Sequence, residues 1–434
     1  MPYELIIIAV LVVFVLLLII GQSIASTLLT SGLIGVVLWR DSRVLDAIVG
    51  PDIFFAVSTY SLSIIPLYLF MAQLLMRGGV VADLFTVGIR VCRGKRFPLG
   101  VATIASGGML GAVSGSGSAA AATLATLASP QLEQIGYSKR YSVALCAVAG
   151  SLSAIVPPSI IMIIYGSITS VPVGELFIGS LVPALICILS FSIVLYFFPE
   201  THAVEVISDN LTQHESIQTS TSGALVASVF VVVLMIIVFG GIYGGLVTAS
   251  EAGALGAFIA LLGLWILRKL SWGDVRASLV EASKVTAMLM MIVVGAQIFG
   301  RFLAYAKIPN MLMDLFTPLM AMPELLIVVL LGFFFIFGLF LESAAVMILL
   351  LPVIMPILTK LEVDLLWFGI VACFTISMGL LTPPVGLATY SAAMSAGIEP
   401  DQVFRVTTLF ASIAALIVAG SLILWPGLAT VFLS

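Results

Sequence analysis

The sequence predicts an all-α polytopic membrane protein made of two inverted repeats, each with a re-entrant helical hairpin and a helix broken by a Pro-Pro pair. Of its 434 residues, 62% are hydrophobic and only 9% are charged, whereas soluble domains have about 25% charged residues. Apolar stretches long enough to span a bilayer recur from residue 4 to the C-terminus. This composition indicates that the chain is embedded in a lipid bilayer. Motifs of the first half also return in the second half in the same order, which predicts the two repeats.

A polar segment near the middle of the chain, 199–222, separates the two repeats. It contains both histidines and begins with Pro199, which ends the preceding apolar run. We expect a first repeat at 1–198 and a second repeat at 223–434. Four pairs of segments match at offsets of 224 to 227 residues: 72–77 with 296–301, Ser118-Ala-Ala with Ser343-Ala-Ala, 149–166 with 375–392, and 173–177 with 400–404. Four matches in order predict an internal duplication.

The distribution of basic residues predicts that the repeats are inverted. The first serine-rich segment is preceded by Arg90, Arg93, Lys95 and Arg96. The equivalent stretch of the second repeat, 319–326, has no Lys or Arg and carries Glu324. Because Lys and Arg concentrate on the cytoplasmic side, the two serine-containing segments are approached from opposite sides of the membrane. Inverted repeats of this kind are typical of secondary transporters.

Each repeat is also expected to contain an amphipathic arm along the membrane surface. In the segment 268–285, Ser271 and Asp274 have the spacing of a capping box, and apolar residues follow one face. The segment 40–49 is its counterpart in the first repeat. A polar loop with some helix is an equal alternative for 40–49.

The segment 98–135 is expected to form the first re-entrant hairpin. Its 38 residues contain no Lys or Arg, and two full crossings would need about 20 residues each as well as a turn. The stretch GAVSGSGSAAAATLA, 111–125, supplies a turn at 114–118, because Ser and Gly permit sharp backbone turns. The second hairpin is expected at 324–361, with its tip near 338–345.

Each hairpin tip is expected to face a broken helix. Proline removes a backbone N–H and clashes with the preceding turn, so Pro157-Pro158 and Pro383-Pro384 should break helices around 150–160 and 379–386. Unpaired backbone groups at membrane depth must face protein or a wet cavity. There, carbonyl and hydroxyl oxygens suit a hard cation such as Na⁺, and helix N-termini suit an anion. Close helix packing and simple proline kinks are the structural alternatives.

Glu342 is a carboxyl group inside an apolar hairpin, where ionisable groups are usually functional. It could ligate a cation, carry a proton or cap the hairpin tip; a structural role is the alternative if water reaches it. The motif SGSGS lacks the lysine of a P-loop, and neither G-x-S-x-G nor H-E-x-x-H occurs. The sequence therefore predicts a transporter and not an enzyme, with its energy supplied by an ion gradient or a partner chain.

Taken together, these segments resemble the large membrane subunit of TRAP (tripartite ATP-independent periplasmic) transporters. The resemblance covers nearly the whole chain and is strongest at 65–79, 111–125, 149–166, 338–358 and 381–390. Two places depart from the family pattern: G-S-S at the first glycine turn is GSGS here, and G-T-L-G before I-P-P-S is GSLSAIVPPS. These departures leave open which serine of the first tip is a ligand.

The resemblance implies an elevator-type fold of the ion-transporter superfamily and a sodium-coupled symporter in the bacterial inner membrane. It would import an organic anion, a carboxylate or a sulfonate, with Na⁺ as coupling ion and no other cofactor. A periplasmic substrate-binding protein would deliver the anion, and a separate small four-helix membrane subunit would complete the permease.

The resemblance also implies the positions of the binding sites, with two sodium sites and one substrate site. The first sodium site would comprise Ser114, Ser116, Ser118, Gly150, Ser153 and Pro157. The second would comprise Gly338, Glu342, Ser343, Gly379, Thr382 and Pro383. The substrate would bind between the tips, near Ser118, Pro158, Ser159, Ser343 and Pro384.

Two alternatives stay open from the sequence. A self-sufficient Na⁺- or H⁺-coupled dicarboxylate or anion transporter would share the hairpins and repeats but would need no binding protein. A channel or an intramembrane enzyme would need a ring of pore-lining charges or a catalytic dyad, and the sequence offers neither.

Overall fold

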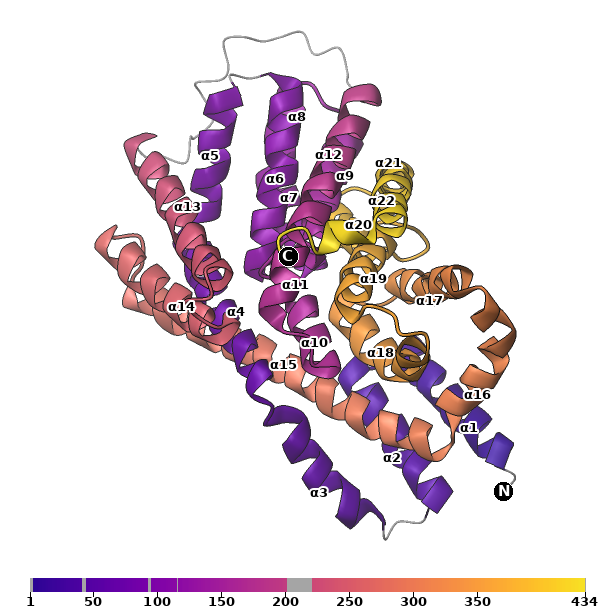
Figure 1. Cartoon of the computed structure of the whole chain (residues 1–434). Helices are drawn as coiled ribbons and strands as arrows, with labels where there is room; N and C mark the ends of the chain where they lie inside the picture. Colours follow the sequence, from indigo (N-terminus) through magenta and orange to yellow (C-terminus); the bar gives the residue numbers. More distant parts are fainter. Residues whose placement is uncertain (1–2, 41–43, 93–94, 115, 201–220, 434) are drawn as a thin grey trace.

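The computed structural model describes residues 3–40, 44–92, 95–114, 116–200 and 221–433 (Figure 1). Every regular element in these ranges is a helix. Seven of the described helices are long and apolar enough to cross a membrane, which confirms the predicted all-α polytopic class. Most of the predicted linker 199–222 lies outside the described residues.

The helices follow one another in a similar order in the two halves of the chain. The first half contains α1 (Tyr3–Ile19), α2 (Ile24–Arg40), α3 (Val44–Val57), α4 (Ile64–Arg77), α5 (Val80–Cys92), α6 (Arg96–Ser114), α7 (Gly117–Leu127), α8 (Ser129–Gln134), α9 (Lys139–Ser151), α10 (Ile160–Thr169), α11 (Val173–Gly179) and α12 (Leu181–Phe197). The second half contains α13 (Thr221–Tyr243), α14 (Ala249–Ile266), α15 (Trp272–Tyr305), α16 (Ile308–Phe316), α17 (Pro323–Gly338), α18 (Ser343–Lys360), α19 (Leu365–Gly379), α20 (Leu387–Ser395), α21 (Pro400–Ala414) and α22 (Gly420–Leu424).

Two helical hairpins and two interrupted helices form the centre of the molecule. Helices α6 and α7 pack together as the first hairpin, and α17 and α18 as the second. Pro157-Pro158 lies between α9 and α10, and Pro383-Pro384 lies between α19 and α20; both peptide bonds are cis. Each Pro-Pro pair therefore occupies a non-helical segment between two helices.

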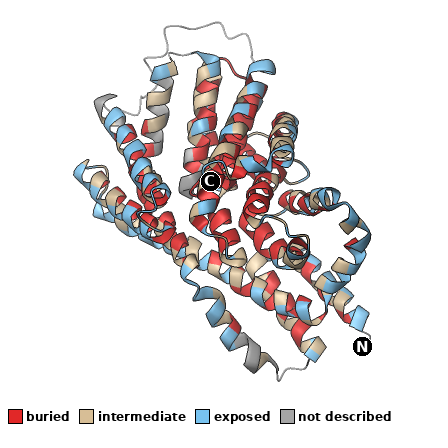
Figure 2. Ribbon diagram, viewed as in Figure 1, coloured by how far each residue is buried: buried red, intermediate tan, exposed pale blue. Residues whose placement is uncertain are grey.

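The halves are interlocked in a crosswise pattern. The first hairpin packs on α9 of its own half and, through α7, on α20 of the other half. The second hairpin packs on α19 of its own half and, through α18, on α10 of the other half. Every residue of α9 from Tyr141 to Ser151 is buried, and the buried residues gather in this central part of the molecule (Figure 2). The core thus lies where hairpins and broken helices meet, while the inversion of the repeats stays a prediction.

A single long helix, α15, is the central element of a scaffold that also contains α2, α3 and α4 (Figure 1). Ser271 and Asp274 form the predicted capping box at its start. With 34 residues it is about 51 Å long, and α2, α3 and α4 pack along it. The predicted arm 268–285 covers the start of this helix, which continues without a proline to Tyr305.

Two ion pairs tie first-half helices to this scaffold. Arg301 Nε and Nη2 contact Asp52 Oδ2 and Oδ1 at 2.7 and 2.8 Å, which joins α15 to α3. Lys269 Nζ lies 2.5 Å from Asp83 Oδ2 of α5. The bidentate Arg301 pair has the geometry of a strong charge-assisted contact. These two ion pairs therefore connect α15 to α3, and the segment before α15 to α5.

Candidate functional site

The two hairpin tips meet at the carboxylate of Glu342. Ser116 Oγ donates a hydrogen bond to Glu342 Oε1 at 3.1 Å, and Ser118 Oγ donates to Oε2 at 2.9 Å. The backbone N–H groups of Gly117 and Ser343 also lie beside this carboxylate. One carboxylate of the second hairpin thus receives hydrogen bonds from residues 224 and 226 positions away in the first.

Two helix N-termini converge at this point. Helix α7 begins at Gly117 and α18 begins at Ser343, directly after Glu342. Ser116 caps α7, because its Oγ accepts a hydrogen bond from the N–H of Ala119 at 3.3 Å. Helix N-termini carry partial positive charge and favour anions. Within the described part of the chain, no Lys or Arg forms an ion pair with Glu342, so helix ends and hydrogen-bond donors stabilise its charge.

The second tip has a buried hydroxyl without a partner among the described residues. Ser116, Ser118 and Glu342 are partly exposed, whereas Ser343 is only 8% exposed and its hydroxyl has no hydrogen-bond partner in that part of the chain. Leaving a buried hydroxyl unpaired costs about 1–3 kcal/mol. Such a group beside a partly exposed carboxylate marks a place where a ligand or water would complete the hydrogen bonding.

The first tip lies directly on the first broken helix. A Cβ built on Gly117 would lie 3.3 Å from Ser153 Oγ and 3.6 Å from the carbonyl oxygen of Gly150. The glycine-rich tip therefore brings α7 next to the carbonyl and hydroxyl oxygens at the end of α9. Ser114 is the last residue of α6, but its side chain lies outside the described residues. Pro157, Pro158 and Ser159 are buried in the segment that follows.

The second tip lies on the second broken helix in a similar way. A Cβ on Gly338 would be 3.0 Å from the carbonyl oxygen of Ile376 and 3.5 Å from Gly379 Cα. Thr382 Oγ1 donates to the carbonyl oxygens of Met378 and Gly379 at 2.8 and 3.2 Å. In contrast to Pro157 and Pro158, the second pair, Pro383 and Pro384, is exposed.

Glu342 is predicted in the second sodium site, and the structure adds that its carboxylate accepts hydrogen bonds from the first tip. The available donors explain this contact. The first tip offers two hydroxyls and a helix N-terminus, whereas the Thr382 hydroxyl donates to carbonyl oxygens of α19. The sequence shows the acidic residue but not this direction, which depends on contacts between the halves.

Sequence analysis missed a second contact between the halves. Ser377 Oγ, near the end of α19, donates to the carbonyl oxygen of Ser151, the last residue of α9, at 2.5 Å. Ser151 and Ser377 occupy matching positions in the two halves, at an offset of 226. The presence of serine at both matching positions was the signal in the sequence that could have indicated this contact. Contacts between matching positions of two repeats are those expected near a pseudo-two-fold axis.

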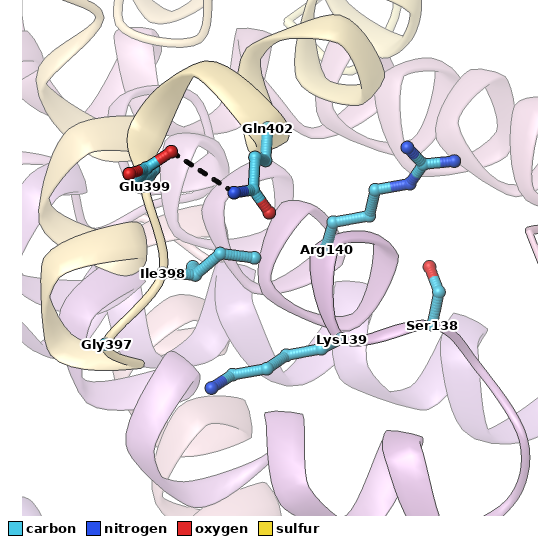
Figure 3. A pocket seen from close by; sticks show the side chains of 7 residues that line it. All are labelled: Ser138, Lys139, Arg140, Gly397, Ile398, Glu399 and Gln402. Carbon is cyan, nitrogen blue, oxygen red and sulfur yellow. Dashed lines mark hydrogen bonds between the residues drawn. The ribbon is translucent and has the colours of Figure 1, made fainter.

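A separate hollow of about 610 Å³ lies at the starts of α9 and α21 (Figure 3). It is lined by Ser138, Lys139, Arg140, Gly397, Ile398, Glu399 and Gln402. Glu399 accepts a hydrogen bond from Gln402 Nε2 at 3.3 Å, and Arg140 pairs with Glu200. Helix α9 has 13 residues, or about 20 Å, so this hollow is separate from the site at the tips.

Comparison with known proteins identifies the family. The sequence matches the family described as "Tripartite ATP-independent periplasmic transporter, DctM component" over residues 11–425. The chain belongs to this family. A TRAP large subunit is a multi-pass inner-membrane transporter component and not an enzyme, which confirms the resemblance found in the sequence.

Relatives within the TRAP family share just over a quarter of the sequence. The C4-dicarboxylate large permease protein of Pseudomonas aeruginosa is 29% identical over 80% of this chain and 80% of its own length. The ectoine/5-hydroxyectoine large permease protein of Ruegeria pomeroyi is 27% identical over 76% of each chain. The isethionate permease protein of Oleidesulfovibrio alaskensis is 29% identical over 81% of this chain, which spans only 55% of that protein.

A solved structure shares the fold of this TRAP subunit. The YdaH transporter of Alcanivorax borkumensis superimposes with a TM-score of 0.61 at 13% identity, and the match covers 89% of each chain. At this identity the likeness concerns the fold alone. It supports a helical transporter architecture.

Proposed function

We propose that this chain is the large membrane subunit of a sodium-coupled importer of an organic anion. A periplasmic substrate-binding protein delivers the anion, and a small four-helix membrane subunit completes the permease. The observation that carries this proposal is the meeting of both hairpin tips at Glu342 between two helix N-termini. Two relatives are named for isethionate and C4-dicarboxylates, which are organic anions of the sulfonate and carboxylate classes.

The anion binds between the two tips in this proposal. The hydroxyls of Ser118 and Ser343 and the N-termini of α7 and α18 are donors suited to a carboxylate or sulfonate. The Ser343 hydroxyl, which has no partner among the residues that the structure describes, supports this placement. Ser159 stays a predicted substrate residue, and its hydroxyl donates to the carbonyl oxygen of Ala154 at 3.0 Å. It holds the first break in shape beside Pro158.

Sodium binds where each tip meets its broken helix. At the first break, the Gly150 carbonyl and the Ser153 hydroxyl lie next to the tip; at the second, Gly338 lies against Gly379 and the residues leading to Thr382. These are neutral oxygen donors, which suit a hard monovalent cation. The nearby charge of Glu342 would favour a cation further.

The contact between hairpin and scaffold supports an elevator movement. A small gap there lies between α2, α15 and α18, and its lining residues are all apolar or glycine: Leu28, Ala296, Phe299, Gly300, Leu303, Ile348, Leu349 and Pro352. A surface of this kind has no ion pairs to break when one element slides along another. The hairpins and broken helices would move together along the scaffold.

Ser153→Ala is expected to weaken sodium binding while leaving the chain folded. Loss of one hydroxyl ligand should cost about 1–2 kcal/mol, which corresponds to a roughly 5- to 30-fold higher dissociation constant for sodium. Equilibrium binding of ²²Na⁺ to the purified chain measures this directly. Ser167→Ala, which removes a hydroxyl bonded within α10, is the matched control. Equal sodium affinity in both variants would remove Ser153 from the site.

A further inference from the structure

We propose that the Glu342 carboxylate is a built-in occupant of the anion cradle at the first tip, and that the transported anion must displace it. The anion cradle consists of the hydroxyls of Ser116 and Ser118 and the N–H of Gly117. This inference rests on the proposed function, since it concerns how that anion enters. It assigns Glu342 the role of a tethered competitor that sets the specificity and coupling of the site.

The bonding of the carboxylate supports this assignment. Each of its two oxygens accepts one serine hydroxyl, at 3.1 and 2.9 Å, and the Gly117 N–H lies beside them. This pattern of paired donors at a helix N-terminus is the one that a free carboxylate or sulfonate requires. The Glu342 carboxylate therefore occupies a site that would also suit the carboxylate or sulfonate group of a transported anion.

The second tip differs from the first in a way that fits displacement. Glu342 corresponds by the repeat offset of 225 to Gly117 of the first tip, so the matching position of the first hairpin carries no carboxylate. At the second tip the Ser343 hydroxyl is buried, and it has no hydrogen-bond partner among the described residues. An anion that replaced the Glu342 carboxylate would meet this free hydroxyl as an additional donor.

The side chain of Glu342 can leave without unfolding either hairpin. Glu342 precedes the first turn of α18 with extended backbone geometry, φ −65° and ψ 148°. It is partly exposed, so rotation of its side chain alone withdraws the carboxylate from the anion cradle. The displaced carboxylate and the arriving anion are like charges in a partly desolvated space, and they repel unless a cation accompanies the anion. Displacement thereby links anion binding to sodium.

Chemical rescue with formate tests the inference. Glu342→Ala empties the anion cradle, and sodium formate should then raise the thermal unfolding midpoint of the purified full-length chain by about 2 °C or more over equal sodium chloride, in a saturable way. The wild type should show no such difference, because its anion cradle is occupied. Glu324→Ala removes an exposed carboxylate at the start of α17 and should behave like the wild type.

Equal responses of wild type and Glu342→Ala, or no response in Glu342→Ala, would overturn the inference. If that variant fails to fold, Glu342→Gln keeps the shape but removes the charge, and it should still respond to formate more than the wild type; a response no larger than that of the wild type also overturns the inference. The assay contains no gradient, binding protein or transport step. A failure of sodium-driven uptake would therefore be seen separately from a failure of rescue.

Discussion

Gly150→Ala is expected to separate α7 of the first hairpin from α9 and to reduce the yield of folded protein severely. A Cβ at this position would lie 2.4 Å from the backbone nitrogen and 2.6 Å from the Cα of Ala121. Both are backbone atoms of α7, so neither can rotate aside. Overpacking costs about 1–3 kcal/mol or more, which exceeds the roughly 1 kcal/mol that alanine gains over glycine in a helix. Fluorescence-detected size-exclusion chromatography and the unfolding midpoint measure the loss.

Gly332→Ala is the matched control for this variant. Gly332 lies inside α17, and a Cβ there would have no neighbour within 4 Å among the described residues. We expect unchanged yield and a slightly higher unfolding midpoint, because only the helix preference changes. If both variants behave alike, the close contact between α7 and α9 does not hold the hairpin.

Replacing both Ser116 and Ser118 by alanine is expected to abolish uptake in a folded protein. Both hydroxyls belong to the anion cradle, where they donate to the Glu342 carboxylate until the transported anion replaces it. The double variant removes two donors from that anion, and a hydrogen bond to a charged group contributes about 1.5–3 kcal/mol. Loss of both should lower the initial rate of uptake by roughly 100-fold or more. The rate is measured in proteoliposomes with the anion that copurifies with the binding protein.

The control for this double variant is the replacement of Thr123 and Thr126, also on α7, by alanine. Their hydroxyls donate to carbonyl oxygens of α7 itself, at 2.9 and 2.8 Å. Near-normal uptake in this control, together with normal elution of both proteins from a size-exclusion column, would assign the loss to the tip. Substantial uptake in the Ser116 and Ser118 variant would show that the transported anion does not need these two donors.

Local features of the fold could be predicted because their causes are local. Two consecutive prolines remove two backbone N–H donors in a row, so the positions of Pro157-Pro158 and Pro383-Pro384 indicate the breaks, whereas the single prolines Pro352 and Pro356 are tolerated inside α18. The Ser and Gly residues at 114–118 indicate the first turn, and Ser271 with Asp274 indicates the start of α15. Each of these signals acts within one or two turns of the chain.

The bonding inside the site could not be predicted, because it depends on contacts between distant segments. Glu342 bonds to serines more than 220 residues away, and its direction is set by which tip has unused donors. The same limit explains the missed contact between Ser377 and Ser151. The length of α15 could not be predicted either, because the amphipathic segment 268–285 gives no signal of where the helix ends.

Uptake driven by a sodium gradient tests the central claim most directly. Proteoliposomes would contain this chain and the small membrane subunit, with the ligand-loaded binding protein outside. We expect the anion to accumulate when an inward sodium gradient and the binding protein are both present, and not when potassium replaces sodium or the binding protein is left out. Equal accumulation in a potassium gradient would contradict sodium coupling, and equal accumulation without the binding protein would identify a self-sufficient transporter instead.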